Sequence, residues 1–459
     1  MTGEDKELKE VNTDFMKEKI KARPVNKRKL LRRTITTACL AALFGAVACV
    51  AFLVLEPVIN RAINPEEPQQ VSIPEETSEE ISPEDMIASD EARQKQETEE
   101  AVSQAVSQIG IDTNSIKQEI KDELAKEMES TSGYKEMYDG LAEAAVKAQE
   151  SIVSVKSITP DYDWAGDAYD QTGSSSGLIV AATSEDVLIL APGDILKSAR
   201  RIEVTFPDDA VAAATIRAVD SVTGMAVIAV DRKDLSEETH GSFGTAVFGS
   251  SQRINLLGRP VIAVGSPTGS LGSVAYGVVT NAQLPLDMTD SSYAQLTTDI
   301  YGSTRASGVL VDTNSEVIGW IDDSHNAKDT PNLLSAIGIT ELKPLIERMS
   351  NGEGLAGAGF HGTAVPEEVQ KEQGVPAGAY ITRVEIDSPA MKAGLQSGDI
   401  VTGFGLTQIG DYQQLITALS NAQPGRDVPL TIMRQGADRY EEAELTLTPE
   451  NRLQAADNS

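Results

Sequence analysis

The stretch Thr298–Leu310, which reads TDIYGSTRASGVL, is a loop rich in glycine, serine and threonine that leads into an apolar run. From about residue 142 onward, the chain contains further short β-branched runs separated by glycine and acidic turns. This alternation is typical of strands joined by tight connections. The runs predicted as strands include Val187–Leu190, Ile202–Phe206, Ala226–Val230, Val261–Val264 and Val317–Trp320. We therefore predict a mostly β architecture for this region.

Further stretches carry a resemblance to a known protein family. They are the glycine-rich Gly173–Val180, then Leu188–Leu196, Asp220–Val227 and Leu256–Pro267. In this order, and followed by Thr298–Leu310, they resemble the HtrA (DegP-like) family from about Ala142 to Ser459. So many ordered matches are more specific than a single motif. The resemblance implies a chymotrypsin-like double β-barrel followed by an α+β PDZ domain.

The resemblance also assigns the positions of a catalytic triad, and none of them carries the expected side chain. Gly193 or Asp194 stands in place of the histidine, Gly224 in place of the aspartate and Ala306 in place of the serine. Alanine has no hydroxyl to attack a carbonyl. Thr304 stands where a glycine supports the amides of the oxyanion hole. The expectation is a degenerate triad, as in a pseudoprotease.

A site rebuilt from neighbouring residues is the alternative. Ser303 and Ser307 flank Ala306, and Asp194 could assist Ser307 as an unconventional base. A serine without a base is a weak nucleophile, so both serines are better interpreted as loop hydroxyls. The candidate general bases are the three histidines His240, His325 and His361, which fall in predicted loops or in the PDZ region.

The PDZ resemblance covers three segments. They are the loop Gly357–Phe360, the segment Ser388–Ile400 and the helix Asp411–Leu419. PDZ domains bind a C-terminal carboxylate with consecutive backbone amides and add the peptide to a strand edge. The resemblance therefore implies peptide binding by the amides of Ala358, Gly359 and Phe360. The side chain of Phe360 would form the floor of the side-chain pocket, and Leu415 and Ile416 would form its wall. A PDZ domain that serves only as a brace is the alternative.

The charge argues against a nucleic-acid partner. The net charge is −31, while residues 1–33 carry an excess of basic residues, 11 against 6 acidic. A surface that binds phosphates would need clustered Lys and Arg, and the sequence does not indicate one. Both cysteines, Cys39 and Cys49, lie in one apolar run, so the C-terminal part needs no disulfide. No motif predicts a metal or a cofactor.

That apolar run, Thr34–Leu55, contains 22 residues without a charge, enough for a helix to cross a bilayer. Basic residues between Lys27 and Arg33 precede it and Glu56 follows it, so the positive-inside rule predicts a cytoplasmic N-terminus and extracytoplasmic C-terminal domains. A cleaved signal peptide is the alternative, although the leading region is long for one.

The region after the predicted span divides into a spacer and a helical segment. Residues 65–100 hold 13 acidic and 2 basic residues with four prolines, which predicts an extended, self-repelling spacer. Between Ala101 and Met128, apolar residues recur at helical spacing with a break at Gly110. Two interpretations of this segment remain. It could form a short coiled coil, which would suit the homotrimers that the family resemblance suggests, or it could be a helix packed on the protease-like domain.

The expected organisation is a basic cytoplasmic segment, a transmembrane helix, an acidic and helical linker, a trypsin-like domain, a PDZ domain and a tail. Their boundaries are 1–33, 34–56, 57–140, 141–350, 355–450 and 451–459, with a glycine-rich hinge at Asn351–Gly357. The expected function is a membrane-anchored, catalytically inactive peptide- or protein-binding module of the bacterial cell envelope, in protein quality control or as a signalling scaffold. The alternatives are an active HtrA-like endopeptidase with an unconventional site and a structural protein with its PDZ domain as an oligomer brace.

Overall fold

The computed structural model describes residues 70–73 and 131–454, except for 163–167, 198, 254 and 438. All of these residues belong to one compact unit that begins at Gln70. Among them, no helix is long and apolar enough to cross a membrane. The predicted span at 34–56 and the predicted helix at 101–128 lie outside the described residues.

The first barrel is built from six antiparallel strands. They are β1 (Ile152–Tyr162), β2 (Ala168–Ala182), β3 (Asp186–Pro192), β4 (Arg201–Thr205), β5 (Val211–Asp220) and β6 (Met225–Asp231). Their order is β5-β4-β1-β2-β3-β6, and pairing of β5 with β6 closes the ring. Successive side chains of β3 point to opposite faces of the sheet, and both faces are buried. Val187 and Ile189 pack in one cluster, whereas Leu188 and Leu190 pack in another.

The second barrel is a closed ring of β7 (Pro260–Ser266), β8 (Ser273–Pro285), β9 (Ala294–Tyr301), β10 (Ser307–Val311), β11 (Val317–Ile321) and β12 (Leu333–Gly338). Its own cluster includes Leu296, Leu310 and Ile318, all essentially inaccessible to solvent. The five strands predicted from the sequence are therefore confirmed as β3, β4, β6, β7 and β11. Two six-stranded barrels confirm the predicted mostly β, chymotrypsin-like class.

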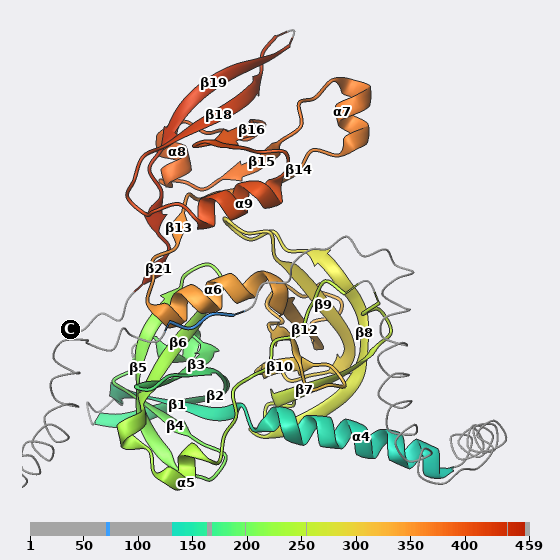
Figure 1. Cartoon of the computed structure of the whole chain (residues 1–459), viewed down its shortest axis with the longest axis vertical. Helices are drawn as coiled ribbons and strands as arrows, with labels where there is room; N and C mark the ends of the chain where they lie inside the picture. The colour runs from blue at the N-terminus through green and yellow to red at the C-terminus, as the bar shows by residue number, and fades with distance from the viewer. Residues whose placement is uncertain are drawn as a thin grey trace, which may run out of the picture. The chain divides into compact units, whose positions relative to one another are not determined.

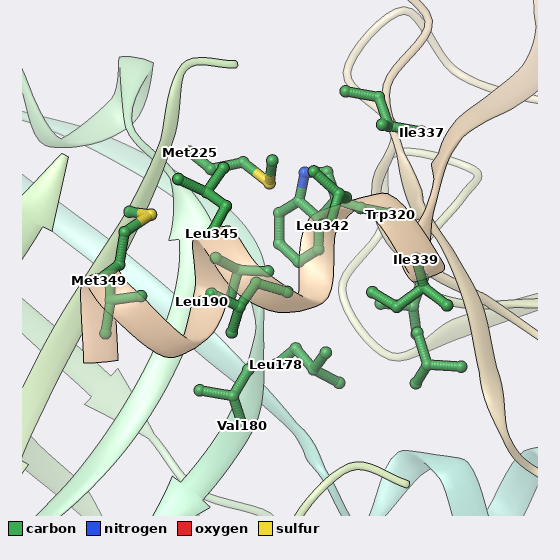
Figure 2. Close-up of a cluster of buried hydrophobic side chains, with 14 of the residues drawn as sticks. Leu178, Val180, Leu190, Met225, Trp320, Ile337, Ile339, Leu342, Leu345 and Met349 are labelled. Atoms are coloured by element: carbon green, nitrogen blue, oxygen red, sulfur yellow. The ribbon is translucent and has the colours of Figure 1, made fainter. Parts of the chain in front are cut away.

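Helix α6 (Ile339–Asn351) completes a core that both barrels share (Figure 2). Leu190 comes from the first barrel and Trp320 from the second, and both lie in the cluster that contains Leu342 and Leu345. The stripe Leu342, Leu345, Ile346 and Met349 is buried, as its helical spacing predicts. The helix ends at Gly352, which adopts the left-handed conformation that residues with a Cβ avoid.

Two segments before β1 pack on the barrels. Helix α4 (Thr131–Gln149) buries Ala144, Ala145 and Ala148, and Ser315 Oγ donates a hydrogen bond to the Ala144 carbonyl. Residues 70–73 lie on α6 (blue in Figure 1). There, Asn351 bonds both the amide and the carbonyl of Val71, and Ile73 is buried. These four residues are fixed in place, which corrects the prediction of a free spacer for this part of 65–100.

The PDZ domain follows α6. Its sheet has the order β14 (Phe360–Ala364), β15 (Ala379–Val384), β16 (Ile400–Phe404), β18 (Val428–Gln435) and β19 (Tyr440–Leu447), with β17 (Thr407–Gln408) on β16. Three helices accompany it: α7 (Glu367–Gln373), α8 (Pro389–Ala393) and α9 (Tyr412–Ser420). Asp411 caps α9, as the predicted groove helix requires, by accepting the Gln414 amide at 2.8 Å. Strand β14 is at the edge of its sheet (Figure 1).

The end of the chain returns to the first barrel. Strand β20 (Glu450–Asn451) pairs with β13 (Ala356–Gly357), and β21 (Leu453–Gln454) pairs with β5. Arg452, which lies between the two strands, and Leu453, the first residue of β21, are buried. This corrects two predictions. Residues 452–454 are a structural element and not a free tail, and β13 within the predicted hinge Asn351–Gly357 is held by its pairing with β20.

Candidate functional site

The loop at the expected nucleophile position is closed by its own backbone. The Ser303 amide donates to the Pro267 carbonyl, and the Ala306 amide donates to the Ser303 carbonyl, both at 2.9 Å. Ala306 itself packs against the core of the second barrel. Its amide is one of the groups that would bind an oxyanion in a serine protease, and here it is already paired.

Ser307 is a buried structural hydroxyl. The side chain is 6% exposed, and its Oγ accepts the Ser176 amide at 3.1 Å. Asp194, the base considered for it, is exposed at the start of the short 3₁₀ helix η1 (Asp194–Leu196). Among the hydrogen bonds of the described residues, none joins Asp194 to Ser307.

The positions expected for the histidine and the aspartate lie next to each other and are joined by backbone. The Gly193 amide donates to the Gly224 carbonyl at 2.7 Å. A Cβ added to Gly193 would lie 2.7 Å from that same oxygen, closer than real Cβ contacts. Gly224 has φ +70°, which a side chain would strain. Glycine at 193 thus lets the two backbones approach this closely, and glycine at 224 allows the left-handed conformation, while a Cβ there would meet nothing within 4 Å.

The histidines are elsewhere. His240, at the end of α5 (Glu237–His240), contacts the Arg232 carbonyl at 3.1 Å through Nε2. His325 is exposed in the connection between β11 and β12. His361 is 3% exposed in the PDZ domain. In the described part of the chain, no hydrogen bond connects any of them to Ser303 or Ser307.

A buried ion pair links the aspartate segment to the end of the chain. Asp220 is fully buried at the end of β5. Its carboxylate accepts hydrogen bonds from Arg452 Nε at 2.5 Å, from Arg452 Nη2 at 2.8 Å and from Thr223 Oγ1. Burial alone would raise the pKa of Asp220. The hydrogen bonds and positive charge of Arg452, together with Thr223, outweigh burial and lower it.

The predicted carboxylate-binding loop holds a carboxylate, and that carboxylate belongs to the chain itself. The amides of Ala358, Gly359 and Phe360 donate to Asp290 at distances between 2.7 and 3.1 Å. Asp290 lies in the connection between β8 and β9 of the second barrel and is 6% exposed. The three residues predicted from the sequence therefore do converge as donors.

The rest of the connection contacts the same face of the PDZ domain. Asp287 Oδ1 lies 2.6 Å from His361 Nδ1, and Thr289 Oγ1 lies 3.0 Å from His361 Nε2. His361 also contacts Glu385 at 2.8 Å and the guanidinium of Arg383. A mixed-charge network thus surrounds the first residue after the loop.

The predicted pocket residues line the core next to this loop. Phe360 and Leu415 are fully buried in the PDZ cluster, and Ile416 packs against it while partly exposed. Tyr412, the first residue of α9, packs edge-on against Phe360 with 6.3 Å between ring centroids. Its ring also lies where a Cβ on Gly362 would stand, so this glycine allows α9 to approach β14 closely.

Asp290, Asp287 and Arg452 were not found from the sequence. Asp290 lies 68 to 70 residues from the amides it meets, and Arg452 lies 232 residues from Asp220. No local pattern marks such pairs. Among the residues that the structure describes, no group of three His, Cys, Asp or Glu side chains could hold a metal ion.

Comparison with known families agrees with this architecture. Residues 175–319 match the model described as a trypsin-like peptidase domain, and residues 351–446 match the PDZ domain model. The chain therefore contains a trypsin-like domain followed by a PDZ domain. This pair of domains is similar to that of the HtrA/DegP family.

The curated relatives are similar at low identity. Serine protease Do-like HtrB of Bacillus subtilis is 24% identical over 298 residues, and serine protease HTRA1 of Xenopus tropicalis is 28% identical over 285 residues. These alignments cover 60% and 58% of this chain, and 63% and 58% of the relatives. The chain therefore matches less than two thirds of the length of either relative.

Among solved structures, the chain is similar to the HtrA-type protease AlgW with decapeptide. The TM-score is 0.48 at 19% identity, covering 68% of this chain and 98% of that one. The serine endoprotease from Yersinia pestis gives a TM-score of 0.45 at 19% identity, covering 68% and 97%.

Proposed function

We propose that this chain is a catalytically inactive HtrA-type protein that binds the C-terminal peptides of other proteins through its PDZ domain. The observation that carries the proposal is the 2.7 Å bond between the Gly193 amide and the Gly224 carbonyl. A general base and its orienting acid need side chains that reach toward the nucleophile. Gly193 and Gly224 carry no side chain, and there is no space for one at Gly193. Asp194, the other candidate for the histidine position, has its side chain exposed.

The nucleophile loop supports the same conclusion. Ala306 offers no hydroxyl, and its amide is paired with the Ser303 carbonyl. Ser307 is buried with its oxygen accepting the Ser176 amide. The competing function, a serine endopeptidase that uses Ser307, has neither an accessible oxygen nor a neighbouring base to support it.

Peptide binding is supported by the donors of the loop at 358–360. Three consecutive amides that hold one carboxylate have the geometry that captures a peptide C-terminus. The edge strand β14 has hydrogen-bonding groups on its unpaired side to which a peptide strand could be added. We further propose that residues 34–56 anchor the chain in the membrane with the C-terminal domains on the extracytoplasmic side.

A structural role for the PDZ domain is the second candidate. Strand β21 on β5, the Arg452–Asp220 pair and Asp290 in the loop all connect the PDZ region with the barrels. These contacts are what a brace within one chain would use. The two candidates differ in whether the amides at 358–360 accept an external carboxylate.

A fluorophosphonate probe tests the inactive site. We expect no covalent labelling of the full chain in detergent and no cleavage of unfolded casein, with trypsin as the positive control. Ala306→Ser alone should also remain unlabelled, because no base would take the proton of the new hydroxyl. Stoichiometric labelling that Ser307→Ala abolishes would show that the protein is an enzyme with an unconventional site.

A further inference from the structure

The contacts of Asp290 reproduce those of a peptide's last residue. Its Oδ2 accepts the Ala358 amide at 2.7 Å and the Gly359 amide at 2.8 Å, and its Oδ1 accepts the Phe360 amide at 3.1 Å. Its own backbone amide donates to the Phe360 carbonyl at 2.9 Å. A peptide added beside β14 with its terminal carboxylate in the loop would need the same donors and could use the same carbonyl.

The connection between β8 and β9 is built to present this residue. Leu286 and Tyr293 close its base through a backbone hydrogen bond of 2.9 Å, and the Ser291 hydroxyl donates to the Met288 carbonyl at 3.1 Å. Met288 and Tyr293 are buried in the core that the barrels share. Asp290 has φ +48°, a conformation that aspartate tolerates better than most residues. Its position follows from a fixed turn.

Contacts around the carboxylate hold the same turn. Arg452 Nη1 donates to the Asp290 carbonyl at 3.2 Å while its other nitrogens bind Asp220. On the other side, Asp287 and Thr289 contact His361. The segment Asp287–Asp290 therefore contacts the PDZ domain at its loop and at the first strand after the loop, and it also contacts Arg452 in the end of the chain that returns to the first barrel.

We propose that Asp290 is an internal ligand of the PDZ carboxylate-binding loop, and that a partner's C-terminal peptide binds only by displacing it. The inference rests on the proposed peptide-binding function and adds its regulation. Each amide at 358–360 already donates to Asp290, so a second carboxylate cannot receive the same hydrogen bonds. Occupancy by the peptide and by Asp290 is therefore mutually exclusive.

Displacement is physically accessible because a peptide can make hydrogen bonds that Asp290 does not make. A peptide strand could continue along the unpaired edge of β14 toward Ala364, whereas the backbone bond from Asp290 ends at Phe360. Additional strand bonds would favour the longer ligand.

The first experiment measures the amides without any peptide. Asp290→Gly removes the carboxylate and suits the positive φ, and Asp209→Gly is its matched control because Asp209 has φ +64° on an exposed turn of the first barrel. In the full chain, hydrogen exchange of the segment containing residues 358–360 should be about tenfold faster in Asp290→Gly than in wild type or Asp209→Gly. Equal exchange in all three would overturn the internal ligand.

The second experiment measures competition. The probe is a pool of fluorescent decapeptides with a free carboxylate and Ala, Val, Leu or Phe as the last residue. We expect the Asp290→Gly protein to bind members of this pool at least about tenfold more tightly than wild type, since the charged hydrogen bonds are freed. Amidated versions of the same peptides should show no such gain.

The outcomes separate the two proposals. Equal affinity for wild type and Asp290→Gly would overturn displacement while peptide capture stands. Faster exchange in Asp290→Gly with no peptide bound by any variant would overturn peptide capture, and Asp290 would then be part of a permanent brace. If Asp290→Gly proves unstable, Asp290→Asn replaces it, because asparagine keeps the size of the side chain and tolerates the backbone conformation. Hydrogen exchange at 358–360 should then be faster, and peptide affinity higher, than in wild type, but by less than for Asp290→Gly.

Discussion

At Gly193, one of the two candidates for the histidine position, the main chain leaves no space for a side-chain carbon. Gly193 and Gly224 face each other with the amide of one bonded to the carbonyl of the other. A histidine or any other side chain at 193 would need these backbones to separate. The proposed inactivity therefore rests on the shape of the main chain as well as on side chains, and a serine at 306 alone would leave the main chain at Gly193 and Gly224 unchanged.

We predict that Gly193→Ala lowers the free energy of unfolding by about 1 to 3 kcal/mol, the usual range for forcing an atom into a packed site. The new Cβ would lie 2.7 Å from the Gly224 carbonyl oxygen. Gly140→Ala is the control, because Gly140 lies within α4 and a Cβ added there would meet nothing within 4 Å. There the substitution should stabilise by about 0.5 to 1 kcal/mol through helix propensity.

Urea unfolding of the full chain measures both substitutions. The expected result is a change of opposite sign in the two proteins. If Gly193→Ala were as stable as wild type, the two backbones could separate at little cost, and the site would be open to a side chain.

At the scale of elements, the barrels and the shared helix follow from local pattern. Strands such as β3 and β6 are short β-branched runs, and α6 carries an apolar stripe, so both could be predicted without knowing their partners. Strand β21 has only two residues, and its partner β5 lies more than 230 positions earlier. Nothing local distinguishes such a strand from a tail.

The same contrast applies to the candidate site. The amides of residues 358–360 could be predicted because glycine and the order of residues mark a carboxylate-binding loop. Their occupant Asp290 could not, since its role depends on where the β8–β9 connection lies after folding. For Ile73, the acidic composition around it pointed to a free spacer, but one buried apolar side chain and the two bonds from Asn351 fix this segment.

Strand β21 is held on the first barrel by Arg452, which gives a second prediction. Replacing Arg452 with methionine leaves the carboxylate of Asp220 buried without its cation. We expect the free energy of unfolding at neutral pH to fall by about 3 to 5 kcal/mol, as for other buried pairs that lose one partner. Asp220→Asn in the same background should recover part of this loss, because the amide carries no charge.

The pH dependence of this effect has a definite sign. In wild type, the pKa of Asp220 is lowered, so its contribution is fully present above the unfolded value of about 3.9 and is lost as pH falls through the lower folded value. Without Arg452, burial would raise the pKa, and protonation would stabilise the variant as pH falls. The difference between wild type and Arg452→Met should therefore shrink from pH 7 toward pH 4. A constant difference over this range would show that the charge of Asp220 is not the cause.

At the scale of the whole molecule, the remaining prediction concerns the side of the membrane. The basic residues before Thr34 and the acidic residues after Pro65 favour a cytoplasmic N-terminus and an external folded unit. Glu66 and Glu67 lie between the predicted span and the residues 70–73 that are held on α6. Cleavage there would separate the anchor from the folded unit and leave the contacts of Val71 and Ile73 intact.

A glutamate-specific protease added to intact cells that express the chain should therefore cleave within residues 65–100 and release a fragment that retains the PDZ domain. Permeabilised cells are the control, in which the N-terminal glutamates also become accessible. The measurement is the mass and N-terminus of the released fragment. If residues 65–100 are protected in intact cells while trypsin cleaves at Lys17 or Lys19 from outside, the orientation is reversed, and the PDZ domain would meet cytoplasmic partners instead of those of the envelope.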